Sequence, residues 1–225
     1  MSDAKPMNPL VPKLIAEFVG TFALIFVGVL VLQHPGVGLT GVALAHGLVI
    51  AVMASALMLV SGAHFNPAVT LALLVGRKIG AMEAVQYIVV QLVAGVAAAL
   101  TASLVLPGLD LAAGTPSLAA AVTPGQGILI EAILTFFLAF VVYGTGVDPR
   151  FNGRIGGLAI GLTVTLDIYA GGPLTGAAMN PARWFGPAAA AMDWSNALVY
   201  ILGPAAGGIL AGWVYSTFIL PKSNA

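Results

Sequence analysis

The tripeptide Asn-Pro-Ala occurs twice in the chain, at Asn66, Pro67 and Ala68 and again at Asn180, Pro181 and Ala182. Proline suits the first position of a helix, because an N–H at that position would have no intrahelical partner. Asparagine before it is a good N-cap, since its side-chain oxygen accepts a backbone N–H of the first turn. Each tripeptide therefore predicts the start of a helix. The stretches that follow, 68–76 and 182–192, are too short to cross a membrane and are interpreted as half-helices.

Two such helix starts would together form a site with a defined chemistry. A helix N-terminus carries about half a positive charge, and a capping asparagine still has amide N–H groups to donate. The segments around Gly62 and Gly176 lead into the half-helices as non-helical backbone, which membranes tolerate only where it is buried in protein or lines a wet cavity. If the two starts meet, the site admits neutral molecules that offer lone pairs and opposes cations, including hydronium.

The elements that position these motifs are predicted to be membrane helices. The chain of 225 residues is 60% hydrophobic and 7% charged, whereas soluble domains carry about 25% charged residues. Its zero net charge and lack of cysteine argue against nucleic-acid binding, disulfides and thiolate metal sites. The first apolar run is too long for a signal-peptide core. A span needs about 20 apolar residues, and six candidates lie at 11–32, 39–60, 83–106, 126–146, 155–172 and 196–219.

The basic residues predict how these spans are oriented. Six spans place seven of the eight basic residues on one side of the membrane, namely Lys5, Lys13, Arg77, Lys78, Arg150, Arg154 and Lys222. The positive-inside rule then puts both termini in the cytoplasm. Arg183 is the exception, because it follows the second Asn-Pro-Ala in the outer loop. Arginine is common on outer surfaces, so this position alone leaves an ordinary surface role open.

The two halves of the sequence form a repeat. EFVGTFALIF at 17–26 resembles EAILTFFLAF at 131–140, and SGAHFNPA at 61–68 resembles TGAAMNPA at 175–182, both at an offset of 114 residues (131 minus 17). Each copy has three spans, so the second enters the membrane from the opposite side, and such inverted folds place their site near the midplane. We therefore predict an all-α membrane protein of six transmembrane helices plus two half-helices, an inverted 3+3 repeat (approximately 11–106 and 126–219) in one domain over 1–225.

With the motifs AEFVGTF, SGAHFNPAVT and GAAMNPAR, the sequence resembles the aquaporin, or major intrinsic protein, family over essentially its whole length. The resemblance implies that Asn66 and Asn180 are the central pore asparagines and that the family's tetramer has one pore per subunit. It also implies that backbone carbonyls form a hydrogen-bond ladder for the permeant. These carbonyls belong to Gly62, Ala63, His64, Phe65, Gly176, Ala177, Ala178 and Met179.

The resemblance further implies an outer constriction, the family's aromatic/arginine filter, at His46, Ile168, Ala177 and Arg183. This quartet departs from the strict water-channel pattern of Phe, His, Cys and Arg and is similar to that of plant tonoplast aquaporins. It lacks the aromatic pair of glycerol facilitators, and Trp184 stands where those proteins have Asp. The expected filter is wider and less selective, admitting ammonia, hydrogen peroxide or urea. The repeat equivalent of Arg183 is Val69, so symmetry does not require the arginine.

Glu17 and Glu131 lie mid-span, one in each repeat. By resemblance they brace the half-helix loops by accepting backbone N–H groups, since buried polar groups are costly when unpaired. The alternative, a proton relay, needs chains of titratable groups that are not visible. His46 could instead be an ordinary buried histidine.

Three further side chains are open to interpretation. His64 is expected to contribute only its carbonyl. Asp167 could cap a loop or hold Arg183 by a charged hydrogen bond. Trp184 either packs behind the filter or anchors at the membrane interface.

The sequence thus predicts a passive channel for water and small neutral solutes that excludes protons and ions. Alternatives are a facilitator mainly for ammonia, glycerol or urea, an ion-coupled secondary transporter, and a non-conducting junction protein. No nucleophile–base pair, cofactor fingerprint or metal-ligand spacing is present, so we expect no enzyme activity, cofactor or metal. The expected partners are water, small solutes, lipid and copies of the chain in a homotetramer, without nucleic acid. Short tails favour a cell membrane, and the filter pattern leaves a vacuolar membrane possible.

Overall fold

The computed structural model describes residues 10–151 and 155–221, and within these ranges the regular structure is helical. Six long helices cross the molecule: α1 (Leu10–Val31), α2 (Gly38–Ser61), α4 (Ala81–Val105), α6 (Pro124–Val142), α7 (Gly156–Thr175) and α9 (Ala197–Val214). Two of them continue into single π-helical turns, α6 into η1 (Tyr143–Val147) and α9 into η2 (Tyr215–Ile219). All six are long and apolar enough to span a membrane. The six predicted spans are therefore confirmed.

Two half-helices start at the repeated tripeptides, α3 (Pro67–Val75) and α8 (Pro181–Ala191). Asn66 and Asn180 have extended backbone angles, and the side chain of each accepts a first-turn N–H, as the sequence predicted. Both half-helices end one residue before the predicted stretches do. A short helix, α5 (Leu111–Gly114), begins at Asp110, whose carboxylate accepts the N–H groups of Ala112 and Ala113.

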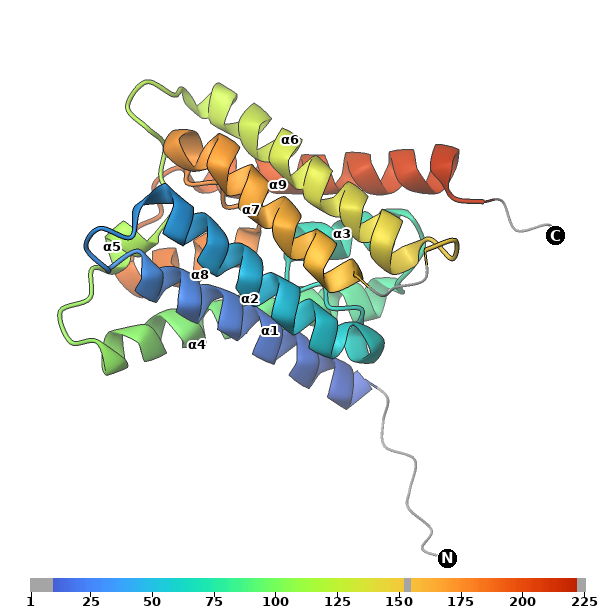
Figure 1. Cartoon of the computed structure of the whole chain (residues 1–225), viewed down its shortest axis with the longest axis horizontal. Coiled ribbons are helices and arrows are strands. Elements are labelled where there is room, and N and C mark those ends of the chain that lie inside the picture. The colour runs from blue at the N-terminus through green and yellow to red at the C-terminus, as the bar shows by residue number, and fades with distance from the viewer. Residues whose placement is uncertain (1–9, 152–154, 222–225) are drawn as a thin grey trace, which may run out of the picture.

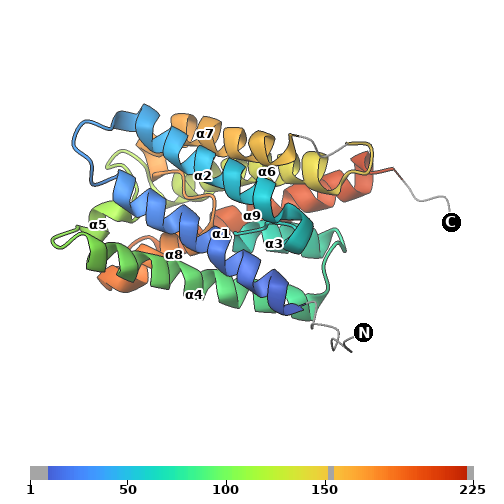
Figure 2. The same ribbon diagram turned by 60° about the horizontal axis from the view of Figure 1, so that its bottom comes forward.

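The half-helices enter the bundle from opposite ends. Figures 1 and 2 both show α8 at the end where α5 lies and α3 at the other end, where α1 begins and η2 stops. Around them α2 packs along α7, α1 along α4, and α6 along α9, while α8 packs on α4 and α3 on α9. The pairing of α1 with α4 thus corresponds to that of α6 with α9, the pairing of α8 with α4 corresponds to that of α3 with α9, and α2 and α7 are counterparts of each other, as expected for an inverted repeat.

Glycines let these helices approach closely. At the α4–α8 contact, a Cβ on Gly95 would lie 2.9 Å from the Ala182 carbonyl oxygen. At the matching α9–α3 contact, a Cβ on Gly212 would lie 2.9 Å from the Ala72 carbonyl carbon. Small residues at helix contacts are the usual way to bring backbones together in lipid. Here they fix each half-helix against a long helix and so set where its N-terminus lies.

Candidate functional site: a pore between the half-helices

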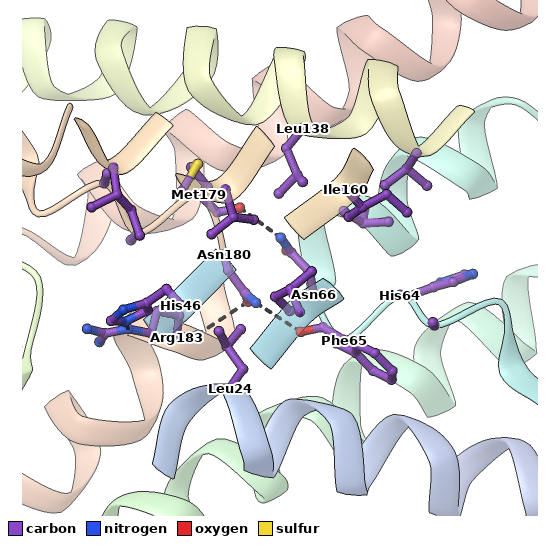
Figure 3. A pocket seen from close by; sticks show the side chains of 18 residues that line it. Leu24, His46, His64, Phe65, Asn66, Leu138, Ile160, Met179, Asn180 and Arg183 are labelled. Atoms are coloured by element: carbon purple, nitrogen blue, oxygen red, sulfur yellow. Dashed lines mark hydrogen bonds between the residues drawn. The ribbon is translucent and has the colours of Figure 1, made fainter. Parts of the chain in front are cut away.

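The two Asn-Pro-Ala tripeptides meet at the centre of the molecule. The Asn66 side-chain amide donates to the Met179 carbonyl at 2.8 Å, and the Asn180 amide donates to the Phe65 carbonyl at 2.9 Å (Figure 3). Meanwhile the side-chain oxygens accept the N–H groups of Ala68 and Ala182. Each amide nitrogen therefore keeps one N–H for another partner, beside two helix N-termini of positive potential.

The loops before the asparagines have an unusual backbone. Ala63, Phe65, Ala177 and Met179 all have positive φ angles, between 45° and 51°, a region that non-glycine residues rarely occupy. Strain of this kind persists only where the surroundings enforce it. Because the same positions are affected in both loops, the conformation belongs to the repeated scaffold.

Two buried glutamates enforce this loop conformation. Glu17 accepts the Ser61 hydroxyl at 2.7 Å and the N–H groups of His64 and Phe65 at 2.9 and 2.7 Å. In the other repeat Glu131 accepts the Thr175 hydroxyl at 2.7 Å and the N–H groups of two loop residues at 2.9 and 2.7 Å, those of Ala178 and Met179. Charged hydrogen bonds of this type are among the strongest available. Each carboxylate thus binds the backbone of the loop that leads into a half-helix.

Sequence reasoning missed several residues of this brace. The hydroxyls of Tyr87 and Tyr200 donate to the carbonyls of Ser61 and Thr175 at 2.9 and 2.8 Å. The signal for Ser61 and Thr175 was available, since both stand at the start of the repeated motif and both carry a hydroxyl. The tyrosines lie on distant helices and left no such signal.

The loop carbonyls are free on the side away from the glutamates. In the described part of the chain, no hydrogen bond reaches the carbonyl oxygens of Gly62, Ala63, His64, Gly176, Ala177 or Ala178. The carbonyls of Phe65 and Met179 differ, because each already accepts a hydrogen bond from the opposite asparagine. Six of the eight predicted carbonyls thus have both lone pairs available, and two are shared with the central pair.

Three cavities that share lining residues lie between the two ends of the bundle. The central cavity, about 40 Å³, is bounded by both asparagines and has room for about three water molecules. It shares His46, Ile168 and Arg183 with a cavity of about 230 Å³ at the α5 end, which we name the outer cavity after the predicted orientation. It shares His64 and Val142 with a cavity of about 350 Å³ at the opposite end, which we name the inner cavity on the same basis. The site is therefore a path with a narrow middle and two wider mouths.

The wall opposite the loops is apolar. Leu24 and Leu138, and Ile50 and Val164, line the central cavity as pairs that are 114 positions apart (138 minus 24 and 164 minus 50). Such side chains neither donate nor accept hydrogen bonds. A molecule inside must therefore take its hydrogen bonds from the loop side, which carries the carbonyls and the asparagines, or from the polar side chains at the two ends of the cavity, His46, His64 and Arg183.

The four predicted filter residues come together near the outer end. His46, Ile168, Ala177 and Arg183 all line the central cavity. The Arg183 Nε donates to His46 Nε2 at 3.2 Å, and its Nη1 donates to the Gly114 carbonyl at 2.9 Å. His46 Nδ1 lies 2.9 Å from the Val42 carbonyl, which can only accept, so Nδ1 carries the proton and Nε2 is the acceptor. Arg183 is 5% exposed, which contradicts an ordinary surface role.

Neither role predicted for Asp167 is correct. The residue lies inside α7, so it does not cap a loop. Arg183 takes its partners from His46 and Gly114, and the buried Asp167 Oδ2 has no hydrogen-bond partner among the described residues. Trp184 is buried and stacks on Tyr200 with ring centroids 5.8 Å apart. The packing interpretation of Trp184 is therefore correct, and the interfacial one is wrong.

The inner mouth carries several of the predicted inside charges. Lys13 donates to Glu83 at 2.8 Å across this mouth, and Lys78 also lines it. Lys5, Arg154 and Lys222 fall outside the described residues. Across residues 10–151 and 155–221 no three His, Asp or Glu side chains are grouped so as to hold a metal ion.

Comparisons with known proteins agree with this architecture. A family model described as major intrinsic protein matches residues 7–215. Aquaporin TIP4-4 of Zea mays is 45% identical over 95% of this chain and 89% of its own length. Probable aquaporin TIP3-2 of Arabidopsis thaliana is 43% identical, covering 93% of this chain and 84% of its own. Nodulin-26 of Glycine max is 38% identical, covering 96% and 80%.

Among solved structures, the aquaglyceroporin from Plasmodium falciparum superposes with a TM-score of 0.85, over 93% of this chain and 97% of that one. At 24% identity this likeness supports the fold alone. The family model covers nearly the whole sequence, and the relatives far exceed chance similarity over almost the same range. The chain therefore belongs to the major intrinsic protein family of multi-pass membrane channels for water or small solutes.

Proposed function

We propose that this chain is a passive water channel that also passes small neutral solutes such as ammonia, hydrogen peroxide and urea, and excludes protons and ions. The observation that carries the proposal is the reciprocal asparagine pair at the middle one of three neighbouring cavities. The free loop carbonyls replace the hydrogen bonds that a water molecule leaves behind in bulk solvent. The apolar wall adds no further binding, so the permeant is not held.

Proton exclusion follows from the same centre. A water molecule between the asparagines accepts the remaining N–H of each, so its own hydrogens point toward the two ends of the pore. The waters on either side are then oriented in opposite directions, and a continuous proton-conducting chain is interrupted. The two half-helix N-termini add a positive potential that opposes any cation.

His46, Ile168, Ala177 and Arg183 are proposed as the outer selectivity filter. Arg183 provides a fixed charge that repels cations, and its guanidinium still has N–H groups beyond those bonded to His46 and Gly114. Ile168 contributes an apolar side chain to this filter, and Ala177 contributes a small one. That composition supports passage of solutes slightly larger than water. It also makes a facilitator mainly for ammonia, glycerol or urea the second candidate.

The two mid-span glutamates argue against an ion-coupled transporter. Both carboxylates are occupied by loop N–H and hydroxyl groups, so they do not offer an ion-binding site. We further propose that the chain is one channel domain over 1–225 that acts without enzymatic activity and assembles as a homotetramer with one pore per subunit. Lysines at the inner mouth support cytoplasmic termini. We favour the cell membrane, with a vacuolar membrane as the alternative.

Osmotic shrinkage of reconstituted vesicles tests this function. Vesicles containing the purified chain should shrink much faster than protein-free vesicles, with a low temperature dependence, and a pH-sensitive dye inside should report no added proton leak. Ammonia, urea and peroxide uptake should also exceed that of protein-free vesicles. Shrinkage no faster than in protein-free vesicles would reject the channel, and gradient-coupled, saturable uptake would indicate a transporter.

A further inference from the structure

His64 lies where the central cavity opens into the inner one. It lines both cavities, and Figure 3 shows its imidazole ring turned away from the asparagines, at the opposite end of the pore from His46 and Arg183. The ring packs edge-on against Tyr87, with centroids 5.0 Å apart. A permeant that passes between the cavities therefore passes this side chain.

Thr70 determines which ring nitrogen of His64 carries the proton. Three groups contact the Thr70 hydroxyl: the Asn66 carbonyl at 3.0 Å, Gln91 Nε2 at 3.1 Å and His64 Nδ1 at 3.1 Å. The carbonyl can only accept, so the hydroxyl gives it its hydrogen. The hydroxyl oxygen must then accept from both other groups. His64 Nδ1 is therefore an N–H donor, and Nε2 is left with a lone pair.

Gln91 holds this arrangement in place. Its Nε2 also donates to the Glu17 carboxylate at 2.9 Å, which excludes the flipped amide, because an amide oxygen would face a carboxylate. Gln91 is fully buried. One glutamate therefore fixes the loop backbone, and through Gln91 and Thr70 it also fixes the orientation of the His64 ring.

The second repeat keeps the glutamate brace but lacks the triad formed by His64, Thr70 and Gln91. At the positions 114 residues on, Ala178 replaces His64 and Trp184 replaces Thr70. Within the described ranges, Glu131 accepts from Thr175, Ala178 and Met179 and has no partner equivalent to Gln91. The triad is thus a specific feature of the inner end, separate from the shared scaffold.

The two pore histidines also differ in what remains free. Both have Nδ1–H groups that donate to oxygen acceptors. The Nε2 of His46 is occupied by Arg183. The Nε2 of His64 has no hydrogen-bond partner among the residues described, although it lies beside Gly62 at the inner cavity.

We propose that His64 Nε2 is a selectivity-determining hydrogen-bond acceptor at the inner end of the pore, held in that state by Thr70 and Gln91. His64 Nε2 accepts a hydrogen bond from an N–H or O–H of the permeant, whereas Arg183 at the outer end donates hydrogen bonds to the permeant. Together the two ends favour molecules that both accept and donate hydrogen bonds, such as water, ammonia and urea. This inference rests on the proposed channel function.

The first test compares water flux in reconstituted vesicles for the wild type and His64→Ala. Alanine widens the passage, so a purely steric role of His64 predicts faster shrinkage. Loss of the acceptor instead predicts slower shrinkage per channel, on the order of fivefold, which corresponds to one ordinary hydrogen bond. His34→Ala is the matched control, because His34 lies outside the three cavities, and its flux should equal that of the wild type.

The outcomes separate the two proposals. Wild-type flux together with undiminished flux in His64→Ala would overturn this inference and leave the channel function intact. Absence of wild-type flux would instead reject the channel function, and with it the acceptor role. Because His64→Ala could alter folding, each sample is normalised to folded protein and its thermal unfolding is recorded.

The second test observes the tautomer directly. In the full chain with ¹⁵N-labelled histidine at mildly alkaline pH, the His64 signal, assigned by its loss in His64→Ala, should report protonated Nδ1 and unprotonated Nε2. Thr70→Val removes the acceptor for Nδ1 and should shift this signal toward the other tautomer, with a smaller loss of water flux. A wild-type signal from protonated Nε2 would overturn the proposal.

Discussion

The outer and inner ends of the pore share one backbone design but carry different side chains. Both have a half-helix capped by asparagine, a braced loop with positive φ angles and an apolar wall. At the outer end Arg183 stands where the inner end has Val69, and at the inner end His64 stands where the outer end has Ala178. The repeat therefore provides the passage, and the departures from the repeat provide the chemistry at each end.

The largest effects should come from the shared brace. Glu17→Gln and Glu131→Gln replace a carboxylate that accepts several hydrogen bonds by an amide, which leaves at least one buried loop N–H without a partner. Each substitution should lower the free energy of unfolding by at least about 2 kcal/mol and abolish most water flux. Glu17→Gln should be the more destabilising of the two, because the Glu17 carboxylate also accepts a hydrogen bond from Gln91. Thermal unfolding in detergent measures the difference, and equal stabilities would argue against the added role of Gln91.

The central asparagines should behave alike. Asn66→Ala and Asn180→Ala each remove a helix cap and one cross-pore hydrogen bond, at a combined cost of about 2 kcal/mol. Because the two bonds are reciprocal and nearly equal in length, at 2.8 and 2.9 Å, the losses should agree within about 0.5 kcal/mol. Denaturation of the two variants side by side provides the comparison. A clear inequality would show that the centre is less symmetric than its hydrogen bonds indicate.

The smallest effects should come from acidic residues outside the spans. At the inner end, hydrogen bonds from Arg150 hold the pKa of Asp148 well below its usual range, and at the outer end those from Ser195 lower the pKa of Asp193. A lowered folded-state pKa stabilises above the unfolded value, about 3.9, and this stabilisation is lost as the pH falls through the folded value. Both contributions should therefore be complete at neutral pH.

Asp148→Asn should lower the neutral-pH Tm by no more than about 3 °C. The change for Asp193→Asn should be smaller still, because Asp148 also accepts from Tyr215 and Arg150 bonds to the Ile219 carbonyl. Melting curves at neutral and acidic pH test both variants. A larger loss in Asp193→Asn would reverse this order.

Local sequence signals predicted the scaffold well. Asparagine followed by proline predicted that each half-helix starts at the proline, which is where both begin. The 114-residue offset placed the two copies in register. The caps depend on neighbours in the chain, and the repeat is visible when the sequence is compared with itself, so a single sequence contains both. The partners of Arg183 could not be read in this way, because His46 and Gly114 lie 137 and 69 residues away. The same is true of Gln91, which reaches Thr70 and Glu17 from another helix.

The interpretation of His64 shows this limit most clearly. Its place in the motif predicted that it contributes only its backbone carbonyl to the pore. The free Nε2 follows from the hydrogen bonds that Thr70 makes with His64 and Gln91, which the sequence does not show. For Asp167, nothing in the described contacts explains its buried carboxylate.

Arg183→Val gives the most direct test, because it makes the outer end match Val69 of the inner end. Water shrinkage and dye-reported proton entry would be measured on the same vesicles, beside the wild type and protein-free vesicles. We expect water flux within about twofold of the wild type, since the carbonyls and asparagines remain, and a proton leak clearly above that of the wild type, because a buried fixed charge between the central and outer cavities is lost. A proton leak equal to that of the wild type would contradict the role assigned to the arginine.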